Sequence, residues 1–301
     1  MFPVTFDVLD ALRGQGLLDD RAAPEVTPLT GGFWNDHFRV RGDGFDWVVK
    51  RIRAGDGASL FPVLPDAEAD ALRALCGLRI APDPVDFFRT GEGDPTLVYA
   101  FWPGTPWRED VAPVADLLRR LHAVPAEGLR GFRSLPVLPA EILAQGDDLL
   151  KTVPGDGLTD RLRALRPASA PGPALSRRSL VHTDVGAGNL IVGENGVRLI
   201  DWQCPGVGDP AEDVWAFLSP GFQILFNHAP LTQAERETFV KAYGDPTTIH
   251  RLAALSLPFA YRMAAYCCLR RSDLADRDPV LSERYRRAAV AEMSKMKGSR
   301  A

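Results

Sequence analysis

Residues 182–189 read His-Thr-Asp-Val-Gly-Ala-Gly-Asn, and they stand directly before a short predicted hairpin that ends in Asp201. The apolar run Leu-Ile-Val at 190–192 favours a β-strand. The sequence Gly-Glu-Asn-Gly at 193–196 predicts a tight turn, because Asn-Gly is a strong hairpin signal. Residues 197–200, Val-Arg-Leu-Ile, are again mostly apolar and predict the returning strand.

Oxygen-bearing side chains flank this predicted hairpin. If Val192 pairs with Val197, Asn189 and Asp201 finish within about one residue of register and lie side by side. An amide oxygen and a carboxylate are ligands that Mg²⁺ takes from proteins. Asp184 precedes Asn189 on a loop that can reach the same place, so the layout is that of a phosphoryl-transfer site. The alternative, a turn aspartate, a capped turn and a strand-end aspartate, does not explain why all three flank one hairpin.

The order His-x-Asp-x₄-Asn, a hairpin and then Asp resembles the catalytic segment of the eukaryotic-like kinases. With His-Thr-Asp at 182–184 and Asp-Trp at 201–202, it is more similar to the aminoglycoside phosphotransferase and choline kinase branch than to protein kinases. The resemblance extends from about Leu29 to Asp213. It implies an α+β, bilobal protein-kinase-like fold with a small β-rich lobe, one main helix in that lobe, and a larger helical lobe.

The resemblance also implies a role for each residue of the catalytic segment. Asp184 would orient the acceptor hydroxyl, and Asn189 and Asp201 would bind Mg²⁺. His182 would support the catalytic loop without acting as the base. Asp213 would support the loop from the following helix.

Hydrophobic spacing and chain breakers agree with a division into two lobes. We expect residues 1–102 to form a nucleotide-binding lobe that ends at a hinge, and residues 103–301 to form a helical lobe with the catalytic loop and the acceptor site. In the first lobe the patterns predict three strands within 26–52, two more at 85–89 and 97–101, and helices at 6–18 and 66–75. In the second lobe they predict helices near 114–121, at 140–150 and 159–165, and over most of 209–295, where Asp209 would be the cap and Glu212 the third helical residue. The proline-rich segment 134–178 has no predicted role.

Gly31 and Gly32 lie between two predicted strands, and Lys50 ends the third. The resemblance makes the glycines the loop that covers the nucleotide and Lys50 the lysine on the α- and β-phosphates of ATP. Without the resemblance, a Gly-Gly turn and an edge-strand lysine that deters aggregation are the simpler interpretations. By strand alternation, Lys50 shares a face with Val48 and Ile52.

Glu68 falls on the same helical face as Leu72 and Leu75, so it is expected to point inward. A buried carboxylate needs a partner, and Lys50 is the natural one, as in the Lys–Glu pair of the kinase family. The alternatives are a first-turn glutamate favoured by the helix dipole, or Asp66 or Asp70 in its place.

Tyr99, Phe101 and Trp102 match the hinge between the kinase lobes, whose backbone would hydrogen-bond adenine. The same aromatic residues could equally belong to the core.

Composition limits the remaining functions. The chain has 301 residues, a formal net charge of −4 and ordinary fractions of hydrophobic and charged residues. These values predict a globular protein with two lobes and no affinity for nucleic acid or an anionic membrane surface. With no signal-like start, no long apolar run and four cysteines outside any Cys-x-x-Cys pair, we expect a cytoplasmic protein without structural zinc.

The sequence therefore predicts an ATP- and Mg²⁺-dependent kinase of a small molecule, with an amino alcohol, a thiamine-like compound, a sugar or an aminoglycoside as acceptor. Aromatic residues of the predicted helical lobe could form a cage for a cation such as choline or thiamine, or pack as core; they are Trp202, Trp215, Phe217, Phe222, Phe226, Tyr261 and Tyr266. A silent pseudokinase that binds a nucleotide or a partner is the main alternative. A metal-dependent hydrolase using His182, Asp184 and Asp201 would need a further cluster of ligands.

Overall fold

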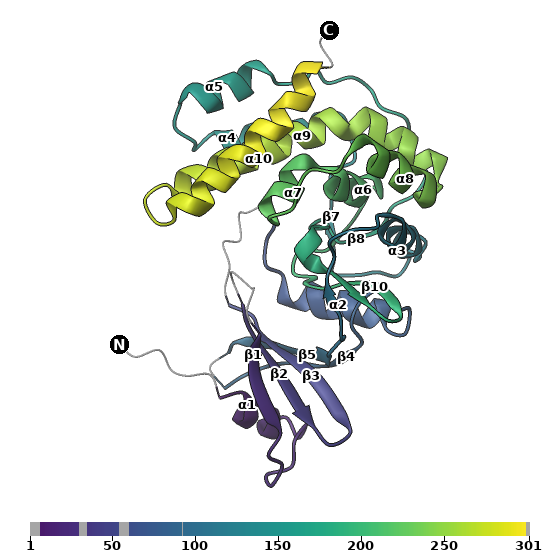
Figure 1. Ribbon diagram of the computed structural model, residues 1–301, viewed down its shortest axis with the longest axis vertical. Helices are drawn as coiled ribbons and strands as arrows, with labels where there is room; N and C mark the ends of the chain where they lie inside the picture. The colour runs from purple at the N-terminus through teal and green to yellow at the C-terminus, as the bar shows by residue number, and fades with distance from the viewer. Residues whose placement is uncertain (1–6, 30–34, 54–59, 92, 299–301) are drawn as a thin grey trace. The chain divides into compact units, whose positions relative to one another are not determined.

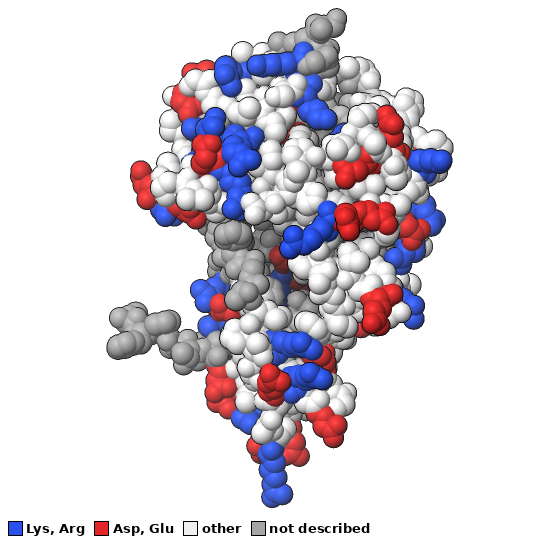
Figure 2. Space-filling model, viewed as in Figure 1, with Lys and Arg blue, Asp and Glu red and all other residues white. Residues whose placement is uncertain are grey.

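The computed structural model describes residues 7–29, 35–53, 60–91 and 93–298 (Figure 1). The chain divides into two compact units, Met1–Gly104 with Ile200–Cys204, and Thr105–Leu199 with Pro205–Ala301. The segment that contains Asp201 therefore belongs to the first unit, although it follows the hairpin of the second. Acidic and basic side chains are mixed on the visible face of each unit (Figure 2).

The first unit contains an antiparallel five-stranded sheet of order β1-β2-β3-β5-β4. The strands are β1 (Glu25–Leu29), β2 (Asp36–Gly42), β3 (Phe45–Arg51), β4 (Pro84–Arg89) and β5 (Pro95–Ala100), and the helices are α1 (Val8–Gly14) and α2 (Pro65–Leu75). The predicted strands and the helix at 66–75 are confirmed within two residues at their ends, whereas the helix predicted at 6–18 is shorter and ends four residues earlier, at Gly14. The breakers explain the boundaries, since Gly44 between β2 and β3 has a φ of +80° that suits glycine.

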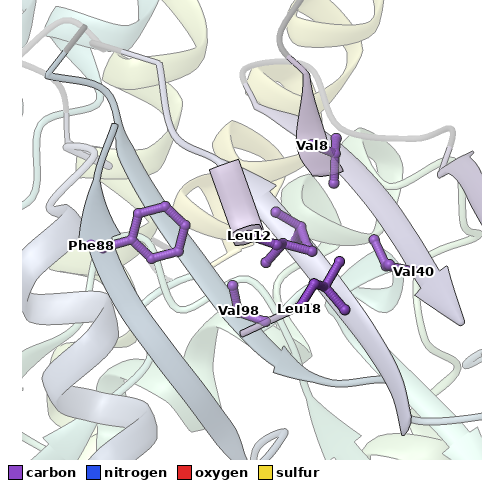
Figure 3. Packing of buried hydrophobic residues seen from close by; sticks show 7 residues of the cluster. Val8, Leu12, Leu18, Val40, Phe88 and Val98 are labelled. Atoms are coloured by element: carbon purple, nitrogen blue, oxygen red, sulfur yellow. The ribbon is translucent and has the colours of Figure 1, made fainter. Parts of the chain in front are cut away.

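Helix α1 covers part of this sheet through a small apolar core (Figure 3). Val8 and Leu12 of α1 pack with Val40 of β2, Phe88 of β4 and Val98 of β5. The Asp7 side chain begins the helix by accepting hydrogen bonds from the backbone of the first turn. This core fixes the sheet on which Lys50 lies.

The second unit is mainly helical (Figure 1). Its helices are α3 (Ala112–His122), α4 (Pro139–Leu150), α5 (Gly157–Ala164), α6 (Ala211–Leu218), α7 (Pro220–Leu225), α8 (Gln233–Tyr243), α9 (Pro246–Leu274) and α10 (Pro279–Gly298). Two three-stranded sheets complete this unit. The first has the order β10-β9-β6, and its strands are β6 (Thr105–Pro106), β9 (Leu190–Gly193) and β10 (Gly196–Leu199). The second has the order β7-β11-β8, and its strands are β7 (Arg133–Ser134), β8 (Ser179–Val181) and β11 (Gly206–Gly208). The predicted helices of this region are confirmed, including α4 and α5 within 134–178.

The predicted hairpin has the expected register. Val192 pairs with Val197 and Leu190 with Leu199, so Asn189 directly precedes the last pair and Asp201 follows it by two residues. Strand β6 adds to the outer edge of β9, a contact that the sequence did not predict. The hairpin is therefore one part of a small sheet.

By length and composition alone, helix α9 is long and apolar enough to cross a membrane. However, 67% of its apolar stretch is buried inside the protein. It also carries buried ion pairs, because Arg251 contacts Asp209 at 2.7 Å and Arg262 contacts Glu212 at 2.6 Å. These contacts are typical of a core helix. The predicted helix start at 209–212 needs one correction. The Asp209 carboxylate accepts the Ala211 N–H at 2.9 Å, as expected of a capping residue. The Glu212 carboxylate, however, pairs with Arg262 and does not complete a cap.

Candidate active site

Three charged side chains meet inside the first unit. The Lys50 ammonium lies 2.7 and 2.8 Å from the two carboxylate oxygens of Glu68 and 2.6 Å from Oδ1 of Asp201. Lys50 is fully buried, Glu68 is 2% exposed, and the side chain of Asp201 is 27% exposed. The structure therefore brings together three of the residues that the sequence assigns to the site.

The elements explain this meeting. Lys50 lies on β3, which is a central strand between β2 and β5, so the edge-strand interpretation is wrong. Glu68 lies on the buried face of α2 with Leu72, as the helical spacing predicts. Asp66 instead pairs with Arg89 on the surface, and Asp70 pairs with its helical neighbour Arg73. Glu68 is therefore the carboxylate of this helix that faces Lys50.

Two carboxylates share the one ammonium of this cluster. Burial lowers the pKa of Lys50, but the nearby charges of Asp201 and Glu68 outweigh that effect and raise the pKa above its ordinary value. Burial raises the pKa of Glu68, and the charge of Asp201 adds to the rise against the attraction of Lys50. Lys50 therefore stays protonated between the two carboxylates.

Two amide side chains of the first unit, Asn35 and Gln203, contact each other. Nδ2 of Asn35, the residue after the predicted glycine loop, donates to Oε1 of Gln203 at 3.5 Å, and both residues are buried. The Asn35 oxygen accepts the Arg53 N–H at 3.2 Å. Gln203 stands where an acidic residue often follows Asp-Trp or Asp-Phe in the kinase family, and here it is engaged with Asn35. Gly31 and Gly32 lie outside the described residues.

The predicted hinge residues have separate surroundings. Tyr99 is buried on β5, and burial raises the pKa of its hydroxyl. The Phe101 N–H donates to the Asp46 carbonyl at 2.9 Å, and the Arg39 guanidinium lies 3.8 Å from the centre of the Phe101 ring. Trp102 is half-buried. An adenine contact would need backbone groups other than the Phe101 N–H, so their role in binding ATP stays a prediction.

In the second unit, Asp184 and Asn189 lie in direct contact. The Asn189 amide nitrogen donates to the backbone carbonyl of Asp184 at 2.9 Å and to its Oδ2 at 3.1 Å. Asn189 is 7% exposed and Asp184 is half-buried. The amide nitrogen is thus committed to Asp184, and the amide oxygen accepts no hydrogen bond from the residues that the structure describes.

Asp213 holds the loop that carries Asp184. Its two carboxylate oxygens accept the backbone N–H groups of His182 at 2.8 Å and Thr183 at 2.7 Å. Thr183 has a φ of +70°, which is uncommon for a β-branched residue and needs such external support. The sequence-based interpretation of Asp213 as structural support agrees with these contacts.

His122 is a site residue that sequence reasoning missed. Its Nε2 lies 3.1 Å from Oδ2 of Asp213, and its Nδ1 lies 2.9 Å from the hydroxyl of Tyr243. All three residues are almost completely buried. Its position on the apolar stripe of α3, four residues after Leu118, was the available signal, because a histidine on a buried face needs partners.

His182 is fully buried, and its Nδ1 accepts the backbone N–H of Asp184 at 3.3 Å. One ring nitrogen is thus used within the loop, which agrees with the prediction that His182 supports the loop. Within the described parts of the chain, no three His, Cys, Asp or Glu side chains are grouped so as to hold a metal ion. The hydrolase alternative, which needs such a cluster, gains no support.

A family model described as "Phosphotransferase enzyme family" matches residues 25–255. The chain belongs to this family. The match includes both the Lys50 cluster and the loop held by Asp213.

Relatives of this phosphotransferase include thiamine kinases. Thiamine kinase of Escherichia coli O17:K52:H18 is 33% identical over 193 residues, which cover 64% of this chain and 65% of the relative. Thiamine kinase of Shigella boydii serotype 4 is 33% identical over 199 residues with the same coverage. The match therefore spans just under two thirds of the length of these kinases.

Solved structures confirm the predicted protein-kinase-like fold. The GDP complex of aminoglycoside 2′-phosphotransferase-IIIa has a TM-score of 0.67 and 17% identity, covering 95% of this chain and 97% of that one. A choline/ethanolamine kinase family protein from Mesorhizobium loti has a TM-score of 0.64 and 16% identity, covering 96% and 92%. At these identities the similarity concerns the fold.

Proposed function

We propose that this phosphotransferase moves the γ-phosphate of ATP to a hydroxyl of a small molecule. The observation that carries the proposal is the buried Lys50 ammonium shared by Glu68 and Asp201. Burying these charges is costly, and such clusters are weak stabilisers of a fold, so a role in binding phosphates accounts for them better. Membership of the family and the names of its thiamine kinase relatives support the same activity.

Each residue then has a chemical task. Lys50 would contact the α- and β-phosphates as a fixed positive charge, and Glu68 would hold the ammonium in place. Asp184 would accept a hydrogen bond from the acceptor hydroxyl, aim its oxygen at the γ-phosphate, and receive its proton. Asp213 and His122 would act only through the loop, by holding the backbone on either side of the His182–Thr183 bond.

The donor atoms fit Mg²⁺. Within the first unit the Asp201 carboxylate is partly exposed, and within the second the Asn189 amide oxygen accepts no hydrogen bond from the described residues. Both are hard oxygen ligands of the kind that Mg²⁺ prefers. We therefore keep Asp201 and Asn189 as the residues that would hold it, and when bound it would neutralise charge on the phosphates.

The acceptor is the less defined part of the proposal. Thiamine is the first compound to test, because the similar curated proteins are named thiamine kinases. Amino alcohols, sugars and aminoglycosides complete the panel. Phosphorylation would be followed as ADP release that depends on the acceptor.

The decisive variant is Asp184→Asn. The amide keeps the size of the side chain and an oxygen for the Asn189 contact, but it cannot accept the proton of the hydroxyl. We expect kcat to fall by about 10²–10⁴-fold with little change in the KM for ATP. Acceptor-dependent ADP release and ATP-dependent thermal stabilisation would be measured on the same preparations.

Asp148→Asn is the matched control, since Asp148 is an exposed aspartate of the same unit that pairs only with its helical neighbour Lys151. It should retain wild-type turnover. Unchanged turnover in Asp184→Asn would refute the assigned role. ATP-dependent stabilisation of the wild type without ADP release for any acceptor would favour the pseudokinase alternative.

A further inference from the structure

One aromatic residue differs from the others that the sequence suggests for an acceptor cage. Six of the seven are at most 8% exposed and belong to the core. Phe226, directly after α7, is the exception, because it is only half-buried. The core interpretation therefore holds for the six, and Phe226 requires a separate explanation.

The Phe226 ring lies against the loop between Asp184 and Asn189. A Cβ atom added to Gly186 would lie 1.8 Å from the ring, and one added to Gly188 would lie 2.7 Å from it. Gly186 has a φ of −105°, which any residue can adopt, so the glycine is required here for space and not for its conformational freedom. The ring thus packs directly against the backbone of these two glycines.

Backbone hydrogen bonds fix the position of Phe226 at the end of α7. Asn227 has a φ of +61°, its N–H donates to the Ile224 carbonyl at 3.0 Å, and the His228 N–H donates to the Gln223 carbonyl at 2.8 Å. This is the Schellman arrangement, which ends a helix in one defined geometry.

The residue that follows is anchored as well. The His228 ring lies over Trp107 with 4.8 Å between ring centres, and its Nε2 lies 2.9 Å from the Arg108 carbonyl. The chain is therefore held on both sides of Phe226. Its ring should lose little conformational entropy when a ligand contacts it.

We infer that Phe226 is a specificity-determining residue of the acceptor site, and that it selects an alcohol that carries an aromatic ring. The inference rests on the proposed function. The ring contacts the same loop as Asp184, since the Gly186 N–H donates to the Asp184 carbonyl at 2.9 Å. A flat acceptor stacked on the exposed part of Phe226 would thus be held beside the residue that aims its hydroxyl.

The charge next to this platform also favours an aromatic acceptor over a polycation. The Arg284 guanidinium lies 3.5 Å from the Leu225 carbonyl, one residue before Phe226. A compound with several ammonium groups would be repelled there, whereas an aromatic ring, even with one delocalised charge, can stack. Thiamine meets this description and is the probe for the test.

The experiment combines two substitutions in a double-mutant cycle on the full chain. Phe226→Ala removes the platform, and we expect the KM for thiamine to rise about 10-fold while kcat and the KM for ATP change less than about 2-fold. In Gly186→Ala the added methyl group clashes with the Phe226 ring and displaces it, so the KM for thiamine should rise similarly. In the double variant the second substitution should add almost nothing, because the ring that clashes has gone.

Phe222→Leu is the control for a purely structural effect, because Phe222 lies on the same helix but is buried against Trp215. It should lower the melting temperature without changing the KM for thiamine. The inference is overturned if Phe226→Ala also lowers only the melting temperature, or if the two substitutions act additively on KM. It is likewise overturned if the wild type phosphorylates only acceptors without an aromatic ring. If no acceptor on the panel is phosphorylated, the proposed function itself fails, which is a different result.

Discussion

Each of the two units contains candidate site carboxylates, but the partners of these carboxylates differ. In the first unit, Glu68 and Asp201 contact the ammonium of Lys50. In the second unit, Asp213 contacts no lysine or arginine among the described residues and accepts two backbone N–H groups instead. The first arrangement concentrates buried charge around one ammonium, and the second holds the backbone of a loop. The two should therefore respond differently when one member is removed.

The largest effect is expected for Lys50→Met. The substitution keeps the length of the side chain but removes the charge that, in the proposed function, neutralises phosphates, so phosphoryl transfer should fall at least about 100-fold. It also leaves Glu68 and Asp201 facing each other without a cation, which should cost about 3–5 kcal/mol of unfolding free energy. Activity and urea denaturation of the same protein measure the two effects.

A second substitution separates charge from stability. In the Lys50→Met, Glu68→Gln protein the two carboxylates no longer repel each other, so most of the lost stability should return while activity stays low. If activity returned with stability, Lys50 would act only on the fold. That result would remove the distinction between the two units.

Part of the Lys50 cluster could be predicted from the sequence, because Lys50 and Glu68 follow simple periodicities and the kinase resemblance pairs them, whereas the contact of Lys50 with Asp201 was not predicted. Strand alternation placed Lys50 on an apolar face, helical spacing placed Glu68 inward, and the Asn-Gly turn fixed the register of the hairpin. Local patterns of this kind predict correctly which side chains face inward when one face of a regular helix or strand is buried. The register that leads to Asp201 was therefore confirmed in the structure.

The rest of the site depends on contacts that no local pattern encodes. His122 meets Asp213 across 91 residues of sequence, and Phe226 meets glycines that lie 38 and 40 positions earlier in the chain. The sheet β7-β11-β8 consists of strands of two or three residues, too short for alternation to be visible. Glu212 had the spacing of a cap residue, but the buried Arg262 is a stronger partner than the helix end.

Asp213→Asn tests the second arrangement. The new NH₂ group would face a backbone N–H, so at least one of the hydrogen bonds to His182 and Thr183 is lost. Unlike in the Lys50 cluster, this loss is not offset by a reduced repulsion between two carboxylates. We expect a loss of about 2–3 kcal/mol in unfolding free energy and about 10–100-fold in kcat, because the loop that carries Asp184 shifts. Asp116→Asn is the matched control, since Asp116 is a half-exposed aspartate of α3 paired with Arg119 and Arg120. A small effect at both positions would show that Thr183 keeps its backbone geometry without Asp213.

A third buried carboxylate extends the comparison to pH. Glu292 of α10 is 1% exposed, and its Oε1 accepts the Ser219 hydroxyl at 2.5 Å and the Gly221 N–H at 2.7 Å. Like Asp213, it binds the chain through neutral donors. Burial raises its pKa to about 7, against the opposing effects of these two hydrogen bonds.

This shift makes the stability of the second unit depend on pH in a defined direction. Between the ordinary pKa of a glutamate, near 4.5, and about 7, Glu292 keeps its proton in the folded chain and loses it in the unfolded one. Stability should therefore fall as pH rises through this window and become constant above it.

Glu292→Gln stays neutral and keeps the accepting oxygen, so it should not share this fall. The difference in unfolding free energy between variant and wild type should shift by up to about 3 kcal/mol in favour of the variant between pH 5 and pH 8. Urea denaturation at several pH values measures the difference, and Glu283→Gln, an exposed pair member of the same helix, should show none over that range. Parallel curves for wild type and Glu292→Gln would mean that the hydrogen bonds from Ser219 and Gly221 fully compensate the burial of the charged carboxylate. In that case the distinction between a cation and neutral donors would not hold in this protein.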